Sequence, residues 1–334
     1  MRKEVILGIT IPGILAIAVL GAWYFTNPVT PGPSTREAIS IGEYPYEASA
    51  LIYIAEDRGL FSENGLNVTT REYSSGPAVI EGLSKGEVDL GLSSEYAVAS
   101  GILAGDDLDA IGVVDKYQTT HLVARKDRGI ENAGSLAGKK LGITRGGSGE
   151  FYLGRFLTLR EVNPQSLTLV DMPPSQYVEA LSNGSVDALV TGVYINEIRE
   201  RWGDAAVIWP IQSSQDSFWV VSCMKDRATS HGGQIQRFLK SIDEAGEFLL
   251  DHPEEARAAV KERLGLDSAS MDLVLQQNEY SLTLGQDLVI AMEDESRWMM
   301  ANNLTDATTV QDFRKHIYTD GLDAVRPGSV NIIG

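Results

Sequence analysis

A twelve-residue stretch occurs twice in this chain, and this repeat constrains the fold more than any other feature. Residues 81–92 (EGLSKGEVDLGL) and 179–190 (EALSNGSVDALV) share Glu, Leu, Ser, Gly, Val and Asp at equivalent positions. An apolar, strand-like run and a turn rich in Ser, Gly or Pro precede each copy. Because the same order of elements occurs twice, we expect two similar α/β lobes with a ligand held in the cleft between them.

Each copy has the pattern of a helix followed by a buried strand. Gly86 and Gly184 stand where the C-terminus of a helix favours a left-handed residue, and short apolar runs follow at Val88 and Val186. Open α/β sheets bind ligands at the carboxyl ends of their strands. We therefore expect ligand contacts from residues 93–96 and from their counterparts after the second strand.

Composition excludes several classes of function. The net charge is −18 and no basic run is present, which disfavours a nucleic-acid partner. The single cysteine, Cys223, cannot form an intramolecular disulfide or a cysteine-based metal cluster, and the four histidines lack metal-ligand spacing. No Ser/His/Asp order or paired-carboxylate motif stands out. We predict a protein that is not an enzyme and that holds no metal or cofactor.

The N-terminus has the pattern of a membrane segment. Arg2 and Lys3 precede an apolar run, residues 5–25, that contains no charged side chain. A helix of this length spans roughly 30 Å, the thickness of a bilayer core. The basic residues predict a cytoplasmic tip (1–4), a transmembrane signal-anchor (5–25) and an extracytoplasmic remainder on the cell membrane. A cleaved signal peptide is the alternative, although its apolar core is shorter, about 7–15 residues.

The remaining chain divides into a tether and two lobes. Residues 26–37 are rich in proline and predict a semi-extended tether. We expect residues 38–122 and 220–334 to form lobe 1, and residues 123–219 to form lobe 2. The chain would then cross between the lobes twice, which makes a hinge. Beyond residue 234 the pattern predicts helices over residues 235–250, 254–264, 270–280 and 286–302.

Several motifs resemble those of a known family: residues 59–61, 65–68, 83–89, 129–130, 136–140 and 180–188. With these motifs the chain is similar to substrate-binding proteins of ABC importers, in the branch that includes nitrate, sulfonate, taurine and thiamin-pyrimidine-precursor binders. This resemblance implies an α/β, two-lobed type II periplasmic-binding-protein fold with two hinge crossings, here preceded by one N-terminal transmembrane helix. After the second repeat, where the family often has an aromatic, an acid and Pro-Tyr, only Tyr194 matches.

Candidate ligand contacts follow the expected strands. Tyr44 and Tyr46 would wall the cleft, unless they are ordinary half-buried loop residues. Residues 74–76 and 146–148 each precede a helix, so their hydroxyl and backbone N–H groups either cap the helix or hold an anion. Trp219 and Trp298 are expected to pack in the core. The predicted ligand-binding residues are Tyr44, Tyr46, Ser74, Ser75, Gly76, Ser93, Ser94, Glu95, Thr119, Thr120, Gly146, Gly147, Ser148, Thr191, Gly192, Tyr194 and Asp216.

Glu95 leaves the charge of the ligand open. If its carboxylate faces the cleft, it favours an amine or another hydrogen-bond donor, and if it faces solvent it carries no information about the ligand. Arg145 and the glycine-rich turn at Gly147 favour an oxyanion. We therefore expect a small polar ligand with an acceptor-rich end at Gly147 and Ser148 and a donor near Glu95.

The function that best fits these features is a membrane-tethered, extracytoplasmic solute-binding component of an ABC importer. Its partners would be a small-molecule solute, the ABC permease and ATPase subunits, and the membrane through the N-terminal helix. One alternative is a solute-sensing ectodomain that signals through a partner. The other is an enzyme related to thiamin-pyrimidine synthesis, which the single cysteine disfavours because that branch uses a cysteine-rich motif.

Overall fold

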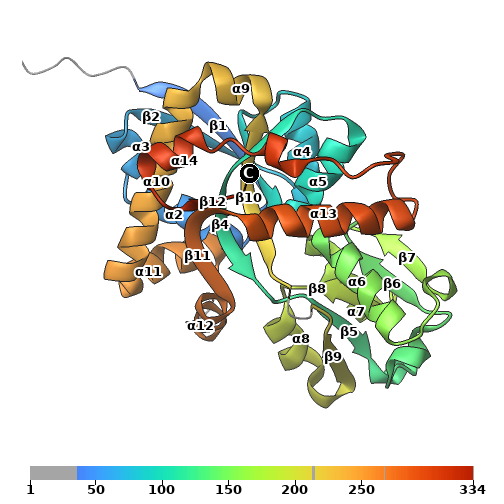
Figure 1. Ribbon diagram of the computed structural model, residues 1–334. Helices are drawn as coiled ribbons and strands as arrows, with labels where there is room; N and C mark the ends of the chain where they lie inside the picture. The colour runs from blue at the N-terminus through green and yellow to red at the C-terminus, as the bar shows by residue number, and fades with distance from the viewer. Residues whose placement is uncertain (1–35, 213–214, 267, 334) are drawn as a thin grey trace, which may run out of the picture. The chain divides into compact units, whose positions relative to one another are not determined.

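Two β-sheets organise the chain (Figure 1). The computed structural model describes residues 36–212, 215–266 and 268–333. The predicted signal-anchor and nearly all of the predicted tether lie outside these residues. None of the helices in the described ranges has the length and apolar character needed to cross a bilayer.

The larger sheet has seven strands in the spatial order β12-β11-β4-β10-β3-β1-β2. Strand β1 pairs in parallel with β2 and β3, whereas β10 runs antiparallel to β3 and β4. The sheet therefore combines a parallel half with strands that return from elsewhere in the chain. Its strands are β1 (Glu37–Glu43), β2 (Leu66–Glu72), β3 (Leu90–Ser94), β4 (Leu108–Tyr117), β10 (Ser217–Met224), β11 (Asn278–Gly285) and β12 (Val330–Asn331).

The smaller sheet has five strands in the order β7-β6-β8-β5-β9. Strand β6 pairs in parallel with β7 and β8, as β1 does with β2 and β3 in the larger sheet. The two sheets thus share a parallel three-stranded unit. Its strands are β5 (His121–Arg125), β6 (Lys140–Ile143), β7 (Thr168–Asp171), β8 (Ala188–Thr191) and β9 (Ala206–Pro210).

The sequence repeat builds the same corner in both sheets. The repeated glycines, Gly86 and Gly184, have φ angles of 69° and 81°, in the left-handed region. The repeated aspartates hydrogen-bond to the backbone of the neighbouring parallel strand. Asp89 accepts from Ser40 N at 2.8 Å, and Asp187 accepts from Lys140 N at 3.0 Å. Similar local geometry therefore explains why these residue types recur.

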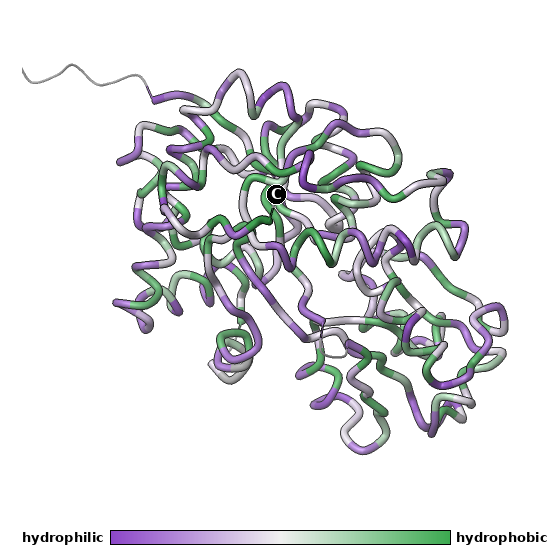
Figure 2. Tube along the Cα trace, viewed as in Figure 1, coloured by the Kyte–Doolittle hydropathy of each residue, from purple (hydrophilic) through white to green (hydrophobic). Residues whose placement is uncertain are grey.

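Helices cover the sheets and continue to the C-terminus. Apolar segments gather in the strands and on the inward helix faces, while polar segments lie outside (Figure 2). The helices are α2 (Ala50–Asp57), α3 (Leu60–Glu63), α4 (Gly76–Ser84), α5 (Glu95–Ala104), α6 (Ser148–Leu159), α7 (Tyr177–Asn183), α8 (Ile195–Trp202), α9 (Lys225–Ser230), α10 (Gly232–Asp251), α11 (Pro253–Leu264), α12 (Ser268–Gln277), α13 (Gln286–Ala301) and α14 (Asp320–Val325).

One predicted helix is wrong in its last three residues. Residues 270–280 were expected to be helical, but α12 ends at Gln277 and strand β11 begins at Asn278. The run Tyr-Ser-Leu-Thr-Leu after residue 279 alternates in polarity, and β11 completes the larger sheet by pairing antiparallel with β4. The pairing partner lies more than 150 residues earlier in the chain, so local propensity alone did not reveal this strand.

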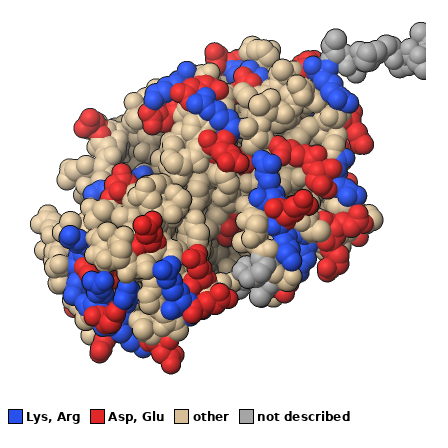
Figure 3. All heavy atoms as spheres, turned by 180° about the vertical axis from the view of Figure 1, so that it is seen from behind, with Lys and Arg blue, Asp and Glu red and all other residues tan. Residues whose placement is uncertain are grey.

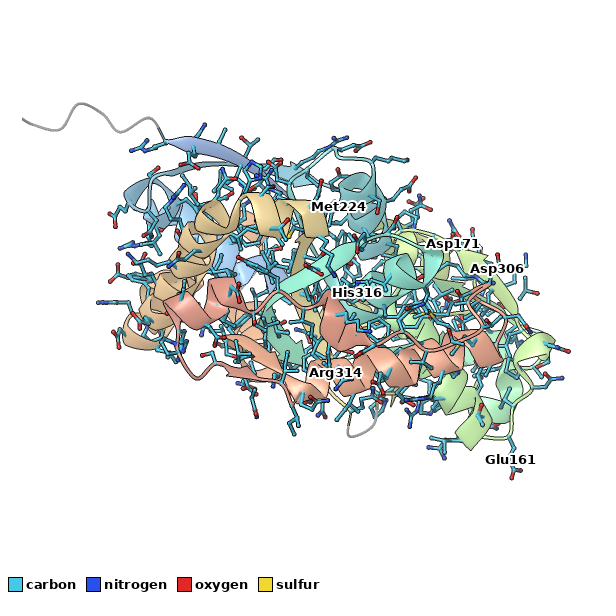
Figure 4. All side chains as sticks on the ribbon, turned by 45° about the horizontal axis from the view of Figure 1, so that its top comes forward. Glu161, Asp171, Met224, Asp306, Arg314 and His316 are labelled. Carbon is cyan, nitrogen blue, oxygen red and sulfur yellow. The ribbon has the colours of Figure 1, made fainter. Side chains whose placement is uncertain are left out.

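Helix α13 connects regions that are distant in sequence. It leaves the larger sheet after β11 and extends toward α6, which covers the smaller sheet (Figure 1). Trp298 of α13 lies 5.6 Å from Phe151 of α6 and 6.4 Å from Tyr96 of α5, measured between ring centroids. The following segment, with Arg314 and His316, packs beside α13 and β4 (Figure 4).

Candidate ligand-binding site

A hollow of about 690 Å³, including its opening to solvent, lies where loops of the two sheets meet. Strands β1, β3, β4, β6 and β8 all contribute residues at or just beyond their carboxyl ends. The lining contains no Lys, Arg, His, Asp or Glu side chain. It consists of Tyr44, Tyr46, Ser75, Gly76, Pro77, Ser94, Tyr117, Thr120, Ile143, Thr144, Gly147, Ser148, Gly149, Pro174, Tyr177, Val190, Thr191, Gly192, Val193 and Trp219.

Three helices present their N-termini to this hollow. Ser75 caps α4 by accepting a hydrogen bond from Ala78 N, and Ser94 caps α5 by accepting one from Ala97 N, each at 3.4 Å. Helix α6 begins at Ser148 with Gly147 as its N-cap, and no side chain caps it. Helix N-termini carry partial positive charge and unpaired N–H groups, so the three together favour an anionic ligand group.

Aromatic side chains form the other wall. The Trp219 ring lies 5.7 Å from that of Tyr46 and 6.3 Å from that of Tyr117, between centroids. Burial raises the pKa of Tyr44 and Tyr46 above the ordinary range, so both phenols stay neutral. The indole N–H of Trp219 has no hydrogen-bond partner among the described residues. This wall suits an apolar or weakly polar part of a ligand.

Hydrogen bonds hold several lining hydroxyls in place. Tyr117 OH and Ser148 Oγ lie 3.1 Å apart, which joins β4 to the start of α6. Thr144 Oγ1 lies 2.7 Å from Tyr177 OH and donates to Met172 O at 3.0 Å. Burial raises the pKa of Tyr177 to about 12. The polar groups of the hollow are therefore neutral donors and acceptors on supported side chains.

Edges of the hollow approach each other closely. A Cβ atom on Gly192, which follows β8, would lie 3.1 Å from Tyr46 OH and 2.9 Å from Thr119 Oγ1. Gly146, with φ of 73°, would place a Cβ atom 3.5 Å from Pro77 Cγ. Space therefore favours glycine at Gly192, whereas at Gly146 the left-handed backbone favours it and an added Cβ would make only ordinary contact with Pro77.

Many of the residues predicted from sequence line the hollow. They lie at or after the ends of β1, β2, β3, β4, β6 and β8, which are far apart in the chain and which the fold brings together. These residues are Tyr44, Tyr46, Ser75, Gly76, Ser94, Thr120, Gly147, Ser148, Thr191 and Gly192. Their contact with a ligand stays a prediction.

The other predicted residues lie outside the lining. Thr119 is buried, and Asp216 accepts a hydrogen bond from Gln118 at 2.6 Å. Gly146 donates its N–H to Glu150, and Tyr194 takes a left-handed conformation, φ 63°, at the start of α8. The residues that do not line the hollow are Ser74, Ser93, Glu95, Thr119, Gly146, Tyr194 and Asp216.

Neither of the two charged candidates, Glu95 and Arg145, lines the hollow. Glu95 is fully buried, and its carboxylate oxygens have no partner among the described donors. Arg145 forms an ion pair with Glu150 at 2.8 Å and is absent from the lining. Neither side chain therefore offers its charge directly to a ligand in this hollow.

Sequence reasoning missed several lining residues. Tyr117, Ile143, Thr144 and Val190 lie at the carboxyl ends of β4, β6 and β8, so a search of every strand end would have found them. Trp219 was expected only in the core; it is buried and also lines the hollow. The remaining missed residues are Pro77, Gly149, Pro174, Tyr177 and Val193.

Comparison with known proteins identifies the family. Residues 47–256, more than half of the chain, match the sequence model described as "NMT1/THI5 like". The chain belongs to the NMT1/THI5-like family. The family resemblance inferred from the sequence motifs is confirmed.

The relatives that match most of this chain are named as binding proteins. A Bacillus subtilis protein named "Putative aliphatic sulfonates-binding protein" is 24% identical over 262 residues, which cover 76% of this chain and 79% of the relative. A fungal enzyme, the 4-amino-5-hydroxymethyl-2-methylpyrimidine phosphate synthase of Aspergillus parasiticus, is 33% identical but matches only 32% of this chain and 30% of its own length. The broader matches are to binding proteins, in agreement with the expected lack of enzymatic activity.

Solved structures show the same fold. The alkanesulfonate-binding protein SsuA from Xanthomonas axonopodis pv. citri, bound to MOPS, superposes with a TM-score of 0.73 at 18% identity and covers 84% of this chain and 98% of that one. The periplasmic aliphatic sulphonate binding protein SsuA from Escherichia coli gives 0.68 at 20% identity, covering 84% and 97%. The chain has the mixed α/β, two-lobed periplasmic-binding-protein fold, as expected from the sequence.

Proposed function

We propose that this protein is the solute-binding component of an ABC importer and captures a small organic oxyanion of the sulfonate type in the cleft between its lobes. Lobe 1 would comprise residues 38–122 and 220–334, and lobe 2 residues 123–219. Family membership and the names of the broadly matching relatives support the importer role. The permease and ATPase subunits would be its partners.

The character of the hollow carries the choice of ligand. Three helix N-termini converge on a lining with aromatic walls and no charged side chain. Backbone N–H groups and hydroxyls would hold the oxyanion, while the rings of Tyr46, Tyr117 and Trp219 would contact an organic tail. The absence of a carboxylate from the lining removes the support for an amine on the ligand. A simple organic anion therefore fits better than a zwitterion.

A charge introduced into the lining tests the sign of the ligand. Thr191 lines the hollow, and its Oγ1 accepts a hydrogen bond from Val193 N at 3.0 Å. Thr191→Asp should weaken binding of ethanesulfonate at least about tenfold, since an ionised carboxylate repels an anion in a partly desolvated site. Thr191→Asn, of the same shape but neutral, is the matched control and should stay within a few-fold of the parent protein.

Calorimetry and thermal unfolding of the full chain would provide the readout. Ethanesulfonate at 100 times its dissociation constant should raise the free energy of unfolding by about 2.7 kcal/mol. Ethylammonium and ethanol are the charge-reversed and neutral probes. Stabilisation by ethylammonium but not by ethanesulfonate, or equal effects of the two Thr191 variants, would argue against an anionic ligand.

The proposed location follows from the N-terminal pattern and the relatives. Residues 5–25 would hold the protein on the extracytoplasmic face of the cell membrane, with the tether of residues 26–37 leading to the lobes. A solute-sensing ectodomain has the same requirements for a binding hollow. Binding of the protein to an ABC permease in a reconstituted membrane separates import from sensing.

A further inference from the structure

Two carboxyl groups are buried side by side behind the hollow. Glu95 is the first residue of α5, and Glu295 lies on α13; both are fully buried, and their helices pack together. None of their four carboxyl oxygens makes a hydrogen bond of good geometry with the described residues, although the Phe218 backbone N–H and the Ser217 hydroxyl lie near Glu95. The two side chains are neighbours, because the charge of Glu95 raises the pKa of Glu295. Two ionised carboxylates buried together repel each other, so a proton on at least one of them stabilises this arrangement.

No cation offsets the pair. Two arginines nearby are already paired: Arg145, in the loop before α6, with Glu150, and Arg155 of α6 with Asp294 of α13, each at 2.8 Å. None of the ion pairs between described residues includes Glu95 or Glu295. The elements packed against α5 and α13 carry other ionisable groups. On α4, Glu81 is exposed and pairs with Lys85. The rest are Asp109, Asp115, Lys116 and Tyr117 of β4, Tyr152 of α6, Cys223 of β10, Glu279 and Tyr280 of β11, and Arg314, Lys315 and His316 beyond α13.

Burial therefore keeps the pair protonated to an unusually high pH. Desolvation raises the pKa of Glu95 to about 8. Burial also raises the pKa of Glu295 well above its ordinary value, and the charge of Glu95 adds to this effect. The pair titrates as a unit, because ionising one carboxyl makes the second harder to ionise.

A charge on the pair would act on side chains that line the hollow. Ser94, directly before Glu95, lines the hollow and caps α5. A negative charge on Glu95 raises the pKa of Tyr117, whose hydroxyl lies 3.1 Å from Ser148 Oγ. Both Tyr117 and Ser148 line the hollow. A negative charge on Glu95 would thus lie beneath the end of the hollow where helix N-termini favour an anion.

We propose that Glu95 and Glu295 share a proton that acts as a co-ligand, so that an anion binds in the hollow with the pair protonated and loss of the proton favours release. This inference rests on the proposed function, because it assumes that the ligand is an anion. Linkage is reciprocal: a proton that favours the anion must itself be bound more tightly when the anion is present. The proton would remove the negative charge of the pair, which would otherwise repel the anion across α5.

Binding measurements at two pH values test the coupling. Ethanesulfonate stays ionised throughout, so any pH dependence belongs to the protein. With the full chain, its affinity should be weaker at pH 9 than at pH 6 by up to about tenfold per pH unit above the pKa of the pair. Calorimetry at pH 9 in buffers of different ionisation enthalpy should show net proton uptake on binding, up to about one proton per ligand.

Two variants separate this role from a merely structural one. Glu95→Gln removes the charge beneath the hollow, so affinity should become nearly independent of pH and proton uptake should vanish. Glu295→Gln supplies an amide donor that stabilises ionised Glu95, so the loss of affinity should move to lower pH. Asp109→Asn, at the other end of β4 and also buried, is the control and should keep the parent pH profile.

Several results would overturn the proposal. Binding of ethanesulfonate without proton uptake at pH 9 would do so, as would an unchanged pH profile in Glu95→Gln. Glu47 borders a neighbouring hollow, and burial raises its pKa to about 7, so loss of uptake in Glu47→Gln alone would assign the proton to that residue instead.

A measurement without ligand keeps the two proposals distinguishable. Failure of ethanesulfonate to bind at any pH would contradict the proposed function. The shared proton would then be decided by infrared spectra of the ligand-free protein at pH 6. A protonated-carboxyl band that shifts or disappears in both Glu95→Gln and Glu295→Gln supports it, and the absence of such a band from the parent protein rejects it.

Discussion

At the residue scale, Gly154 shows packing overruling local propensity. A glycine in the middle of α6 costs the helix about 1 kcal/mol relative to alanine. The indole ring of Trp298 lies directly against its Cα, however, and would collide with an added methyl group. Trp298 also contacts Phe151 edge-on, with ring planes at 86°. The missing side chain is thus what allows α13 to seat its tryptophan on α6.

We predict that Gly154→Ala destabilises the protein. Overpacking against a rigid indole costs about 1–3 kcal/mol, which outweighs the gain in helix propensity of about 1 kcal/mol. Urea unfolding of the variant should show a net loss of up to about 2 kcal/mol. Gly246→Ala in α10 is the matched control, because nothing lies within 4 Å of an added Cβ atom there. That control should gain about 0.5–1 kcal/mol.

If Gly154→Ala and Gly246→Ala instead stabilised the protein equally, the Trp298 ring would have to move at no cost. The packing of α13 on α6 would then be looser than its aromatic contacts indicate.

At the scale of elements, one side chain ties together the two segments that join the sheets. The chain leaves β4 for β5 through residues 118–120, and residues 211–212 and 215–216 lie between β9 and β10. The Gln212 amide accepts from Thr120 N at 3.1 Å and donates to Tyr117 O at 2.8 Å and Gln215 O at 3.0 Å. Both crossing segments are therefore held at one point.

We predict that Gln212→Ala destabilises the protein by about 1–3 kcal/mol, since buried backbone groups of both crossings would lose their partner. Gln118→Ala is the control: its amide makes an exposed hydrogen bond to Asp216, so its loss should cost within about 0.5 kcal/mol. Thermal and urea unfolding of both variants would measure the difference. Equal effects would mean that solvent replaces the buried Gln212 contacts without cost.

At the scale of the whole molecule, charges of the two signs are not segregated on the one face that Figure 3 shows. Acidic and basic side chains intermingle on the face seen in Figure 3, despite a net charge of −18. The hollow is the contrasting region, because its lining is uncharged. Selectivity for an anion would then come from fixed backbone dipoles, which a net negative protein can aim locally against its overall field.

Membrane anchoring by residues 5–25 is the prediction at this scale. Full-length protein should remain with membranes through high-salt and carbonate washes, because residues 5–25 form an uncharged apolar run long enough to cross a bilayer. Removing residues 1–36 should release it into the soluble fraction. Mass spectrometry of the N-terminus provides the check: a mature chain beginning near Trp23 or Thr26 would show cleavage instead of anchoring.

The sequence by itself predicted the family, the class of fold and the strand ends that build the hollow. The repeat made this possible, since Gly86 and Gly184 serve a turn geometry that the neighbouring residues largely determine. Local patterns also predicted most of the helices. These features survive in sequence because they depend on residues close together in the chain.

Only the tertiary structure decided what lies beside what. Glu95 was a candidate ligand contact because it follows Ser94, yet the rotation of α5 buries it against Glu295, which lies two hundred positions later. Strand β11 and the place of Trp219 in the hollow likewise depend on distant partners. A side chain's direction and its desolvation are set by packing between elements, and a single sequence records neither.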